Sequence, residues 1–250
     1  MDGLNTGSEL PLTLKGARSR RPARLGSVVL EDLAHPIISG TFAEGSVLPT
    51  EPVLCEQFGF SRTVIREGLK QLEERGLVRV EQGRGTRVQP RNSWNLLDPT
   101  VIRIALAYDH DMSLLDSLIT VRRVLEREMA LAAASRLSDD DFAALAENLE
   151  RTRTAFDDYD RFREFDNEFH AIVMRASGNE VGLTIVRTIH QFGGVMPPLA
   201  SAASRAALKR TLAAHRAIYE ALKARDAENA AELIAAHIQS AWQDRKRRRP

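Results

Sequence analysis

The stretch SRTVIREGLKQLEERGLVRVEQGRGTRV, residues 61–88, decides the fold of the first part of the chain. Its first half repeats apolar residues at helical spacing, and Ser61 is a suitable residue to cap the start of a helix. Gly76 ends the pattern, as glycine often does after the last helical turn. The second half alternates apolar and polar residues around Gly83-Arg84-Gly85, which predicts a β-hairpin.

A short helix is predicted immediately before this stretch. The segment EPVLCEQF, residues 51–58, follows the candidate N-cap Thr50 and stops at Gly59. Two helices joined by a tight turn that contains glycine are typical of a helix-turn-helix. Together with the hairpin, they predict a winged helix-turn-helix DNA-binding domain over residues 24–90.

The predicted helix that follows Ser61 has two different faces. Ile65, Leu69 and Leu72 share the face that would pack on the domain core. The start of the helix and its neighbouring arc carry the candidate DNA-binding side chains Ser61, Arg62, Thr63, Arg66 and Lys70. Arginine can read guanine in the major groove, and Arg84 at the hairpin tip could enter the minor groove. A solvated cationic face is the alternative for this helix alone, but the hairpin behind it favours DNA binding.

Composition excludes several other classes of protein. The 250 residues are 43% hydrophobic and 28% charged, with a net charge of +1, which is ordinary for a globular chain of two domains. The single cysteine, Cys55, excludes a disulfide framework and fits the reducing cytoplasm. No apolar run approaches the ~18 residues of a membrane span, and the N-terminus lacks the apolar core of a signal peptide.

The remaining segments are predicted as follows. Residues 1–23 are rich in Gly, Ser, Pro and Arg, which predicts a disordered basic arm that could touch phosphates. Residues 91–100 form a linker, and residues 246–250 end the chain as a solvated basic tail. Between them, residues 101–245 predict an all-α antiparallel bundle, so the fold is mainly α. Its expected helices are 100–109, 113–136, 139–156, 158–176, 180–193, 202–224 and 227–247.

Four residues on three of these helices could hold a divalent metal ion. Asp166 and His170 lie one turn apart in EFDNEFHAIVM, while His215 and His237 lie on two later helices among alanines. Imidazole and carboxylate ligands suit Zn, Ni, Mn or Fe. Taken one at a time, each histidine is better explained as a core residue that is satisfied by a hydrogen bond.

The quoted motifs resemble those of a known family. Residues 61–88 are similar to the winged helix of GntR-type bacterial transcription regulators. RRVLE at 122–126, DNEFH at 166–170, ASGN at 176–179 and the later His-bearing helices resemble the FadR-type effector domain. The segment PRNSWNLLD, residues 90–98, is similar to the linker of regulators of sugar-acid catabolism, in particular the galactonate-responsive type.

This resemblance implies roles for individual residues. Asp166, His170, His215 and His237 match the metal ligands of the family, with zinc as the first choice of metal. Arg62, Arg66 and Arg84 would contact DNA. Arg122 would face an effector, and we assign Asn179 and His190 to the same effector pocket. Gly68 stands where the family usually has alanine.

We therefore expect a homodimeric repressor that binds a palindromic operator in double-stranded DNA. A small carboxylate, such as a sugar acid, would bind at the metal and release the operator. An activator remains the alternative direction of regulation. Two other functions stay open: a metal-dependent hydrolase or other metalloenzyme, although the chain lacks an HExxH motif, and a metal-free regulator that responds to acyl-CoA.

Overall fold

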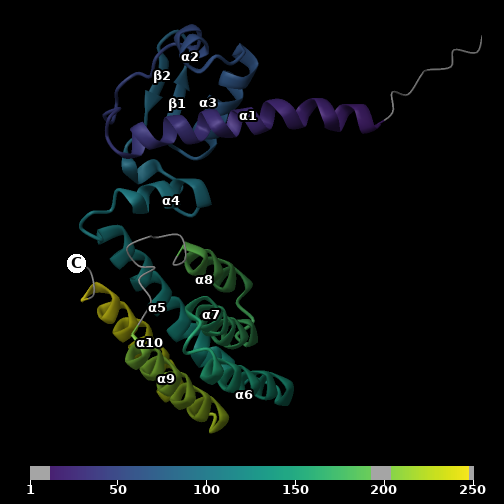
Figure 1. Cartoon of the computed structure of the whole chain (residues 1–250), viewed down its shortest axis with the longest axis vertical. Helices are drawn as coiled ribbons and strands as arrows, with labels where there is room; N and C mark the ends of the chain where they lie inside the picture. Colours follow the sequence, from purple (N-terminus) through teal and green to yellow (C-terminus); the bar gives the residue numbers. More distant parts are fainter. Residues whose placement is uncertain (1–11, 193–203, 248–250) are drawn as a thin grey trace, which may run out of the picture. The chain divides into compact units, whose positions relative to one another are not determined.

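The computed structural model describes residues 12–192 and 204–247 and divides the chain into two units, Met1–Tyr108 and Asp109–Pro250. Helices dominate the described part of both units, and the only sheet in it has two strands (Figure 1). The predicted mainly-α fold, a winged helix-turn-helix followed by a helical bundle, is confirmed. None of the helices in the described ranges is both long and apolar enough to cross a membrane.

The first unit is built on helix α3 and the hairpin that follows it. Its elements are α1 (Leu12–Ile38), α2 (Glu51–Phe58), α3 (Arg62–Glu74), β1 (Val78–Glu81), β2 (Gly85–Val88), the 3-10 helix η1 (Arg91–Ser93) and α4 (Pro99–Ala107). Helix α3 packs against α1, α2 and β1. Ile65 and Leu72 are fully buried on its inner face, as the apolar pattern predicts. The opposite side of α3 is left for solvent or a partner.

The hairpin has a regular register and a glycine-dependent tip. Val78 pairs with Val88 at one end, and Glu81 pairs with Gly85 at the other. Gly83 and Gly85 adopt φ angles of 75° and 93°, in the left-handed region that favours glycine. The backbone N–H of Leu48 donates to the Thr86 carbonyl at 2.8 Å, which ties the loop before α2 to the hairpin.

Helix α1 is longer than predicted. Residues 12–23 form its first turns, so the expectation that the whole arm 1–23 is disordered is wrong for this part; residues 1–11 lie outside the described residues. Leu, Lys, Ala and Arg, which favour helix, are frequent there. Pro36 lies in the last turn of α1, and the helix ends two residues later at Ile38.

Helix α4 is part of the first unit, although the sequence suggested a linker up to residue 100 and a new domain from 101. Val101 and Ile104 are fully buried in the same apolar core as α1 and α3. Asp98 caps the helix by accepting hydrogen bonds from the N–H groups of Thr100 and Val101 at 2.9 and 3.1 Å. The boundary therefore follows Tyr108, because the apolar face of α4 is used by the first unit.

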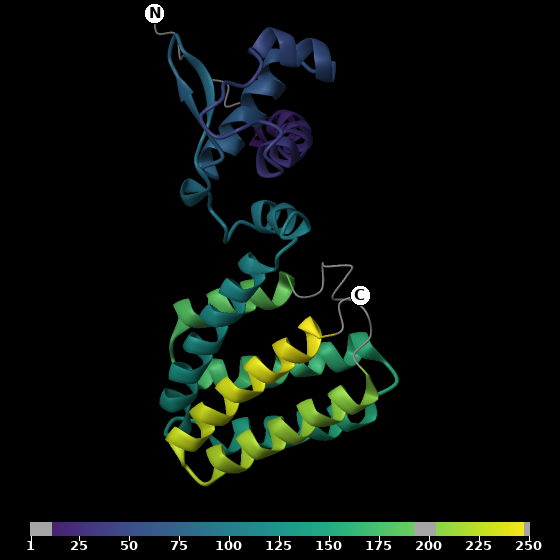
Figure 2. The ribbon, with the colours of Figure 1, turned by 90° about the vertical axis from the view of Figure 1, so that its left-hand side faces the viewer.

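The second unit is an all-helical bundle. Its helices are α5 (Ser113–Ala134), α6 (Asp139–Thr154), α7 (Tyr159–Ala176), α8 (Glu180–Phe192), α9 (Arg205–Lys223) and α10 (Ala227–Lys246). Each coincides with a predicted segment to within a few residues. Helix α5 packs against α7, α8 and α10, while α9 and α10 lie side by side as an antiparallel pair (Figure 2). This arrangement brings α5, α7, α9 and α10 around one interior region.

The basic C-terminal run, expected as a solvated tail from residue 246 onward, begins at the end of α10, where the side chains of Lys246 and Arg247 are exposed. Helix α10 continues to Lys246, whose Nζ lies 2.9 Å from Asp116 Oδ2 on α5. Arg247 forms an ion pair with Asp244. Residues 248–250 lie outside the described part of the chain. Each of these two exposed cations thus has an acidic partner: Asp116 on α5 for Lys246, and Asp244, three residues earlier on α10, for Arg247.

Gly68 lets α3 approach α1 closely, which leads to a prediction about stability. A Cβ atom at this position would lie 2.5 Å from Cγ1 and 2.6 Å from Cβ of the buried Val29. Alanine favours helix by up to about 1 kcal/mol, but overpacking costs about 1–3 kcal/mol. We therefore expect Gly68→Ala to lower the free energy of unfolding, measured by urea denaturation.

The matched test is the double variant Gly68→Ala/Val29→Gly. Val29→Gly removes both the Cγ1 and the Cβ atom that the new Cβ would meet, so the double variant should be more stable than the sum of the two single effects predicts, by about 1 kcal/mol or more. Strict additivity of the two substitutions would show that the Gly68–Val29 contact does not limit helix packing.

Candidate functional site

The candidate DNA-binding side chains lie on the exposed side of α3 and at the hairpin tip. Ser61, Arg62, Thr63, Arg66, Lys70 and Arg84 are all exposed. Arg66 Nε donates to Glu51 Oε2 on α2 at 2.9 Å, and Lys70 Nζ lies 3.7 Å from Glu74. Neither Arg62 nor Arg84 forms an ion pair with any residue that the structure describes. These two guanidinium groups are therefore available to an external anion.

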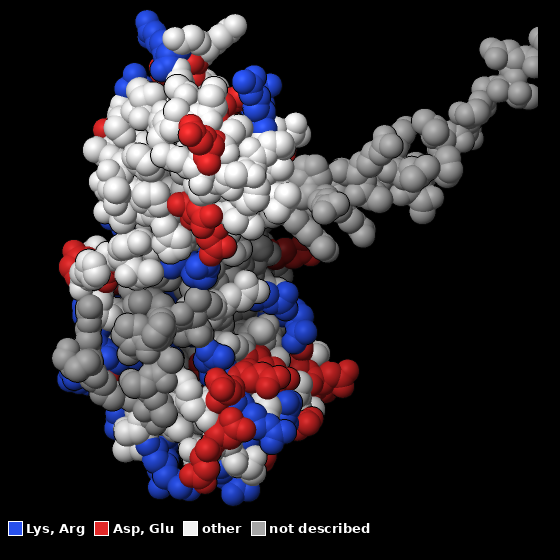
Figure 3. Space-filling model, turned by 45° about the horizontal axis from the view of Figure 1, so that its top comes forward, with Lys and Arg blue, Asp and Glu red and all other residues white. Residues whose placement is uncertain are grey.

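Charge on the face of the molecule drawn in Figure 3 is mixed. Figure 3 shows Lys and Arg side chains interspersed with Asp and Glu on the visible face, in agreement with the net charge of +1. Attraction of the whole protein to DNA is therefore weak, and affinity would depend on the local placement of cations such as Arg62 and Arg84.

The four candidate metal ligands converge inside the second unit. Helix α7 supplies Asp166 and His170, α9 supplies His215, and α10 supplies His237. One ligand atom from each lies within 4.8 Å of those from all the others. His215 Nε2 is 3.2 Å from His237 Nε2 and 3.4 Å from Asp166 Oδ1. The three imidazoles are buried, while Asp166 is partly exposed.

Neighbouring side chains hold two of these rings in place. Glu126, fully buried on α5, is hydrogen-bonded to Nδ1 of His170, which leaves Nε2 directed at the cluster. The Phe169 ring stacks on His215 with centroids 4.1 Å apart and an interplanar angle of 6°. A carboxylate behind a histidine fixes the orientation of the ring and its tautomer, and makes it a better metal ligand.

The donor set fits a divalent metal. Nε2 of His170 is buried and has no hydrogen-bond partner among the described residues, although an unpaired buried nitrogen is costly. Three ring nitrogens and one carboxylate, with no thiolate, suit zinc, nickel, manganese or iron. A metal ion at this point would give His170 Nε2 the partner that it lacks. It would also separate Nε2 of His215 from Nε2 of His237, which face each other.

Burial and neighbouring charges prepare these groups for metal binding. Burial lowers the pKa of His237 to about 3, and burial together with the adjacent His237 imidazole lowers the pKa of His215 well below its usual value. Burial alone would raise the pKa of Asp166, but His215, His170 and Arg122 hold it below its usual range. Two imidazoles are thus neutral and the carboxylate is ionised, as metal coordination requires.

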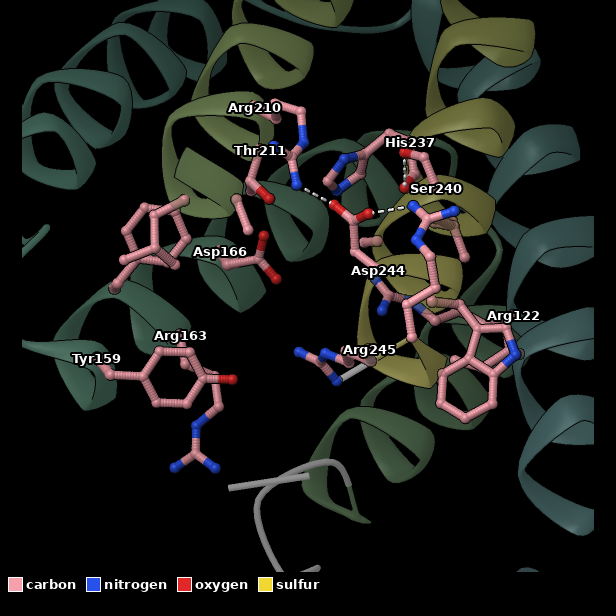
Figure 4. A pocket seen from close by; sticks show the side chains of 18 residues that line it. Arg122, Tyr159, Arg163, Asp166, Arg210, Thr211, His237, Ser240, Asp244 and Arg245 are labelled. Atoms are coloured by element: carbon pink, nitrogen blue, oxygen red, sulfur yellow. Dashed lines mark hydrogen bonds and ion pairs between the residues drawn. The ribbon is translucent and has the colours of Figure 1, made fainter. Parts of the chain in front are cut away.

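A cavity of about 310 Å³ opens beside the cluster (Figure 4). Asp166 and His237 line it, and the Asp166 carboxylate points into the open space. Its other polar lining residues are Arg122, Tyr159, Arg163, Arg210, Thr211, Ser240, Asp244, Arg245 and Arg247. The volume is at the lower end of the range for small-molecule sites.

The three residues assigned to the effector pocket have different surroundings. Arg122 lines the cavity, and its Nε donates to Glu126 Oε1 at 2.5 Å. His190 lies 3.4 Å from Glu126 and lines a smaller adjoining cavity of about 50 Å³. Asn179 lines neither cavity; its Oδ1 accepts from Gly182 N at 2.9 Å at the start of α8. Asn179 is thus a helix cap, a role that its position before a helix could have indicated.

Several residues that line the cavity or lie beside it were not identified from the sequence. Glu126 lines neither cavity but is buried beside Arg122, His170 and His190. Arg163 and Arg245 line both cavities. The i, i+4 spacing of Arg122 and Glu126 was a usable signal for their pairing. No local pattern places α7 and the end of α10 around one cavity.

Two family models match the chain. The model described as bacterial regulatory proteins, gntR family, matches residues 25–88, and the model of the FCD domain matches residues 117–240. The first match covers the winged helix, and the second covers the helices that carry the metal cluster. The two matches therefore correspond to the two units of the structure.

Curated relatives extend over most of the chain. The galactonate operon transcriptional repressor of Escherichia coli (strain K12) is 30% identical over 208 residues, which is 83% of this chain and 91% of that protein. The Glc operon transcriptional activator of the same strain is 35% identical, over 65% of this chain and 63% of its own length. The repressor NanR of Klebsiella aerogenes is 26% identical over 91% of this chain and 89% of its own length.

A solved structure has the same fold. Lar, which controls the expression of the Listeria monocytogenes agr system, matches with a TM-score of 0.57 and 17% identity, over 89% of this chain and 96% of that chain. At this identity the likeness concerns the architecture alone.

Proposed function

This chain belongs to the GntR family of bacterial transcription regulators, and we propose that it represses a catabolic operon and leaves its operator when a small carboxylate binds beside a metal ion in the second unit. Its winged helix is a DNA-binding domain and its FCD domain binds effectors. Repression, the metal and the class of effector are the parts that we propose.

The observation that carries the proposal is the cluster of Asp166, His170, His215 and His237 at the wall of a cavity that also contains Arg122. These four residues would hold the metal. When bound, a divalent ion offers a Lewis-acidic docking point for an anionic oxygen. Zinc is the first candidate, with nickel, manganese and iron as alternatives.

Residues of the chain would orient the effector. The Nε of Arg122 is held by Glu126, and neither of its two terminal nitrogens has a partner among the described residues. They could donate charge-assisted hydrogen bonds to a carboxylate. The hydroxyl groups of Tyr159 and Thr211 line the same cavity and suit a hydroxylated acid. The E. coli repressor named for the galactonate operon is consistent with such a sugar acid.

We propose a homodimer in the cytoplasm that binds a palindromic operator, with half-sites about one helical turn apart. Arg62, Thr63 and Arg66 would face the major groove, Ser61 and Lys70 the backbone, and Arg84 the minor groove. An effector that binds the DNA-free arrangement more tightly would lower operator affinity.

The alternatives are less well supported. The matched families and relatives are transcription regulators, so the chain is not an enzyme. A metal-free regulator that responds to acyl-CoA would leave the buried Nε2 of His170 without a partner, and a cavity of about 310 Å³ favours a smaller acid.

An operator-shift assay tests this function. Metal-loaded protein is titrated onto the DNA upstream of its own and neighbouring genes, and sugar acids are added to the complex. We expect a sugar acid to release the DNA only from metal-loaded protein, because Arg122 alone would hold it weakly. Release that persists after chelation and removal of the metal would favour the metal-free alternative.

A further inference from the structure

The cavity carries more positive charge than one carboxylate can neutralise. Five arginines and two aspartates line it: Arg122, Arg163, Arg210, Arg245, Arg247, Asp166 and Asp244. Asp244 pairs with both Arg210 and Arg247, and Asp166 is one of the four proposed metal ligands. The remaining three arginines, Arg122, Arg163 and Arg245, differ in how far nearby carboxylates neutralise their charge.

Arg245 stands out among these arginines. Its guanidinium has no ion pair or hydrogen bond with any part of the chain that the structure describes. It is partly buried and lines both the large cavity and the small one. Figure 4 shows it directed into the middle of the cavity, with open space between it and Asp166.

Arg163 increases this excess of charge. Its only partner within the described ranges is Asp160, an exposed residue on the same helix, at 3.5 Å. An exposed pair of this kind contributes little and is easily exchanged for another anion. Arg122, by contrast, already has Glu126 at 2.5 Å.

We propose that Arg245, supported by Arg163, binds a second anionic group of the effector, so that the cavity selects small acids with two anionic groups over monocarboxylates. This inference rests on the proposed function, in which the first carboxylate docks beside Arg122 and the metal cluster. A second carboxylate or a phosphate would satisfy Arg245 equally, because both accept paired hydrogen bonds from a guanidinium.

The test compares matched acids by isothermal titration calorimetry on the metal-loaded full chain. Galactonate and galactarate have the same carbon chain and stereochemistry but one and two carboxylates; gluconate and 6-phosphogluconate differ by a phosphate. We expect at least one dianion to bind about tenfold or more tightly than its monoanionic partner, as expected for an added hydrogen bond to a charged group. The pair that shows the preference identifies the second group as carboxylate or phosphate.

The Arg245→Gln variant should abolish this preference and leave the affinity for the monoanion within about threefold, since its carboxylate contacts other residues. Lys246→Gln is the matched control, because it removes the same charge one residue later, from a side chain that pairs with Asp116 and does not line the cavity. It should keep the preference.

The outcomes separate the two proposals. Equal weakening of mono- and dianions in Arg245→Gln, or no weakening, would overturn the role of Arg245. Binding of monoanions without any preference for dianions would overturn the second anionic group and leave the proposed function standing. Failure of all four acids to bind the metal-loaded wild type would reject the sugar-acid effector and the second anionic group together.

Discussion

The double variant His215→Ala/His237→Ala is expected to purify without a bound divalent metal, whereas the wild-type chain retains about one ion per chain. The two substitutions remove the ligands on α9 and α10 and leave only Asp166 and His170, both on α7. Because losing a residue that merely supports a ligand already costs about 10- to 100-fold in metal affinity, losing two ligands should cost more. Elemental analysis after gel filtration measures the result.

The matched control is His110→Ala, since His110 is exposed and lies outside the cluster. This variant should keep its metal. Thermal unfolding provides a second readout that does not depend on purification history. At a metal concentration 100 times the Kd, binding adds about 2.7 kcal/mol to the free energy of unfolding. That should raise the Tm of the wild type by about 5–10 °C and leave the double variant unchanged.

If the double variant is folded and keeps the metal content of the wild type, the four residues do not form the metal site. If it fails to fold, the single variant His237→Ala and the chelated wild type still decide the question. A wild type whose Tm does not respond to chelation or to added zinc, nickel, manganese or iron would show that the cluster is a structural core of histidines.

The winged helix and the bundle could be predicted because their signals are local. The apolar face of α3, the glycines of the hairpin and the periodic helices of the second half each fix an element within a short stretch of sequence. The assignment of α4 to the first unit depended instead on which apolar core its Val101 and Ile104 would join. Periodicity identifies an apolar face but does not identify its partner.

The candidate metal site could be predicted only in part. Asp166 and His170 are one turn apart, so the sequence places them on the same face of one helix. His215 and His237 could be assigned to the same site only through the resemblance to a family, because α9 and α10 are far from α7 in the sequence. Glu126 and Arg245 depend on the packing of α5 and α10 around the cavity, and sequence spacing does not encode that packing.

On the winged helix, Arg62→Ala and Arg66→Ala are each expected to weaken operator binding about 5- to 150-fold, corresponding to the roughly 1–3 kcal/mol of a paired contact between arginine and a base. Both side chains are exposed in the first turns of α3, the part of a recognition helix that approaches the bases. Arg62 is unpaired among the described residues, whereas Arg66 must exchange its ion pair with Glu51, worth up to about 1 kcal/mol, for DNA. The loss in Arg66→Ala should therefore be the smaller one.

The measurement is an operator-shift titration at several salt concentrations, on the operator and on an unrelated duplex. A base contact predicts weaker binding to the operator alone, whereas a phosphate contact predicts weaker binding to both duplexes and a salt dependence reduced by about one ion. Arg103→Ala is the control, because Arg103 belongs to the same unit but pairs with Glu31 away from α3. If Arg62→Ala and Arg66→Ala both bind the operator as tightly as the wild type and the Arg103→Ala control, α3 is not the helix that reads the operator. The search for base contacts would then move to Arg84 at the tip of the hairpin.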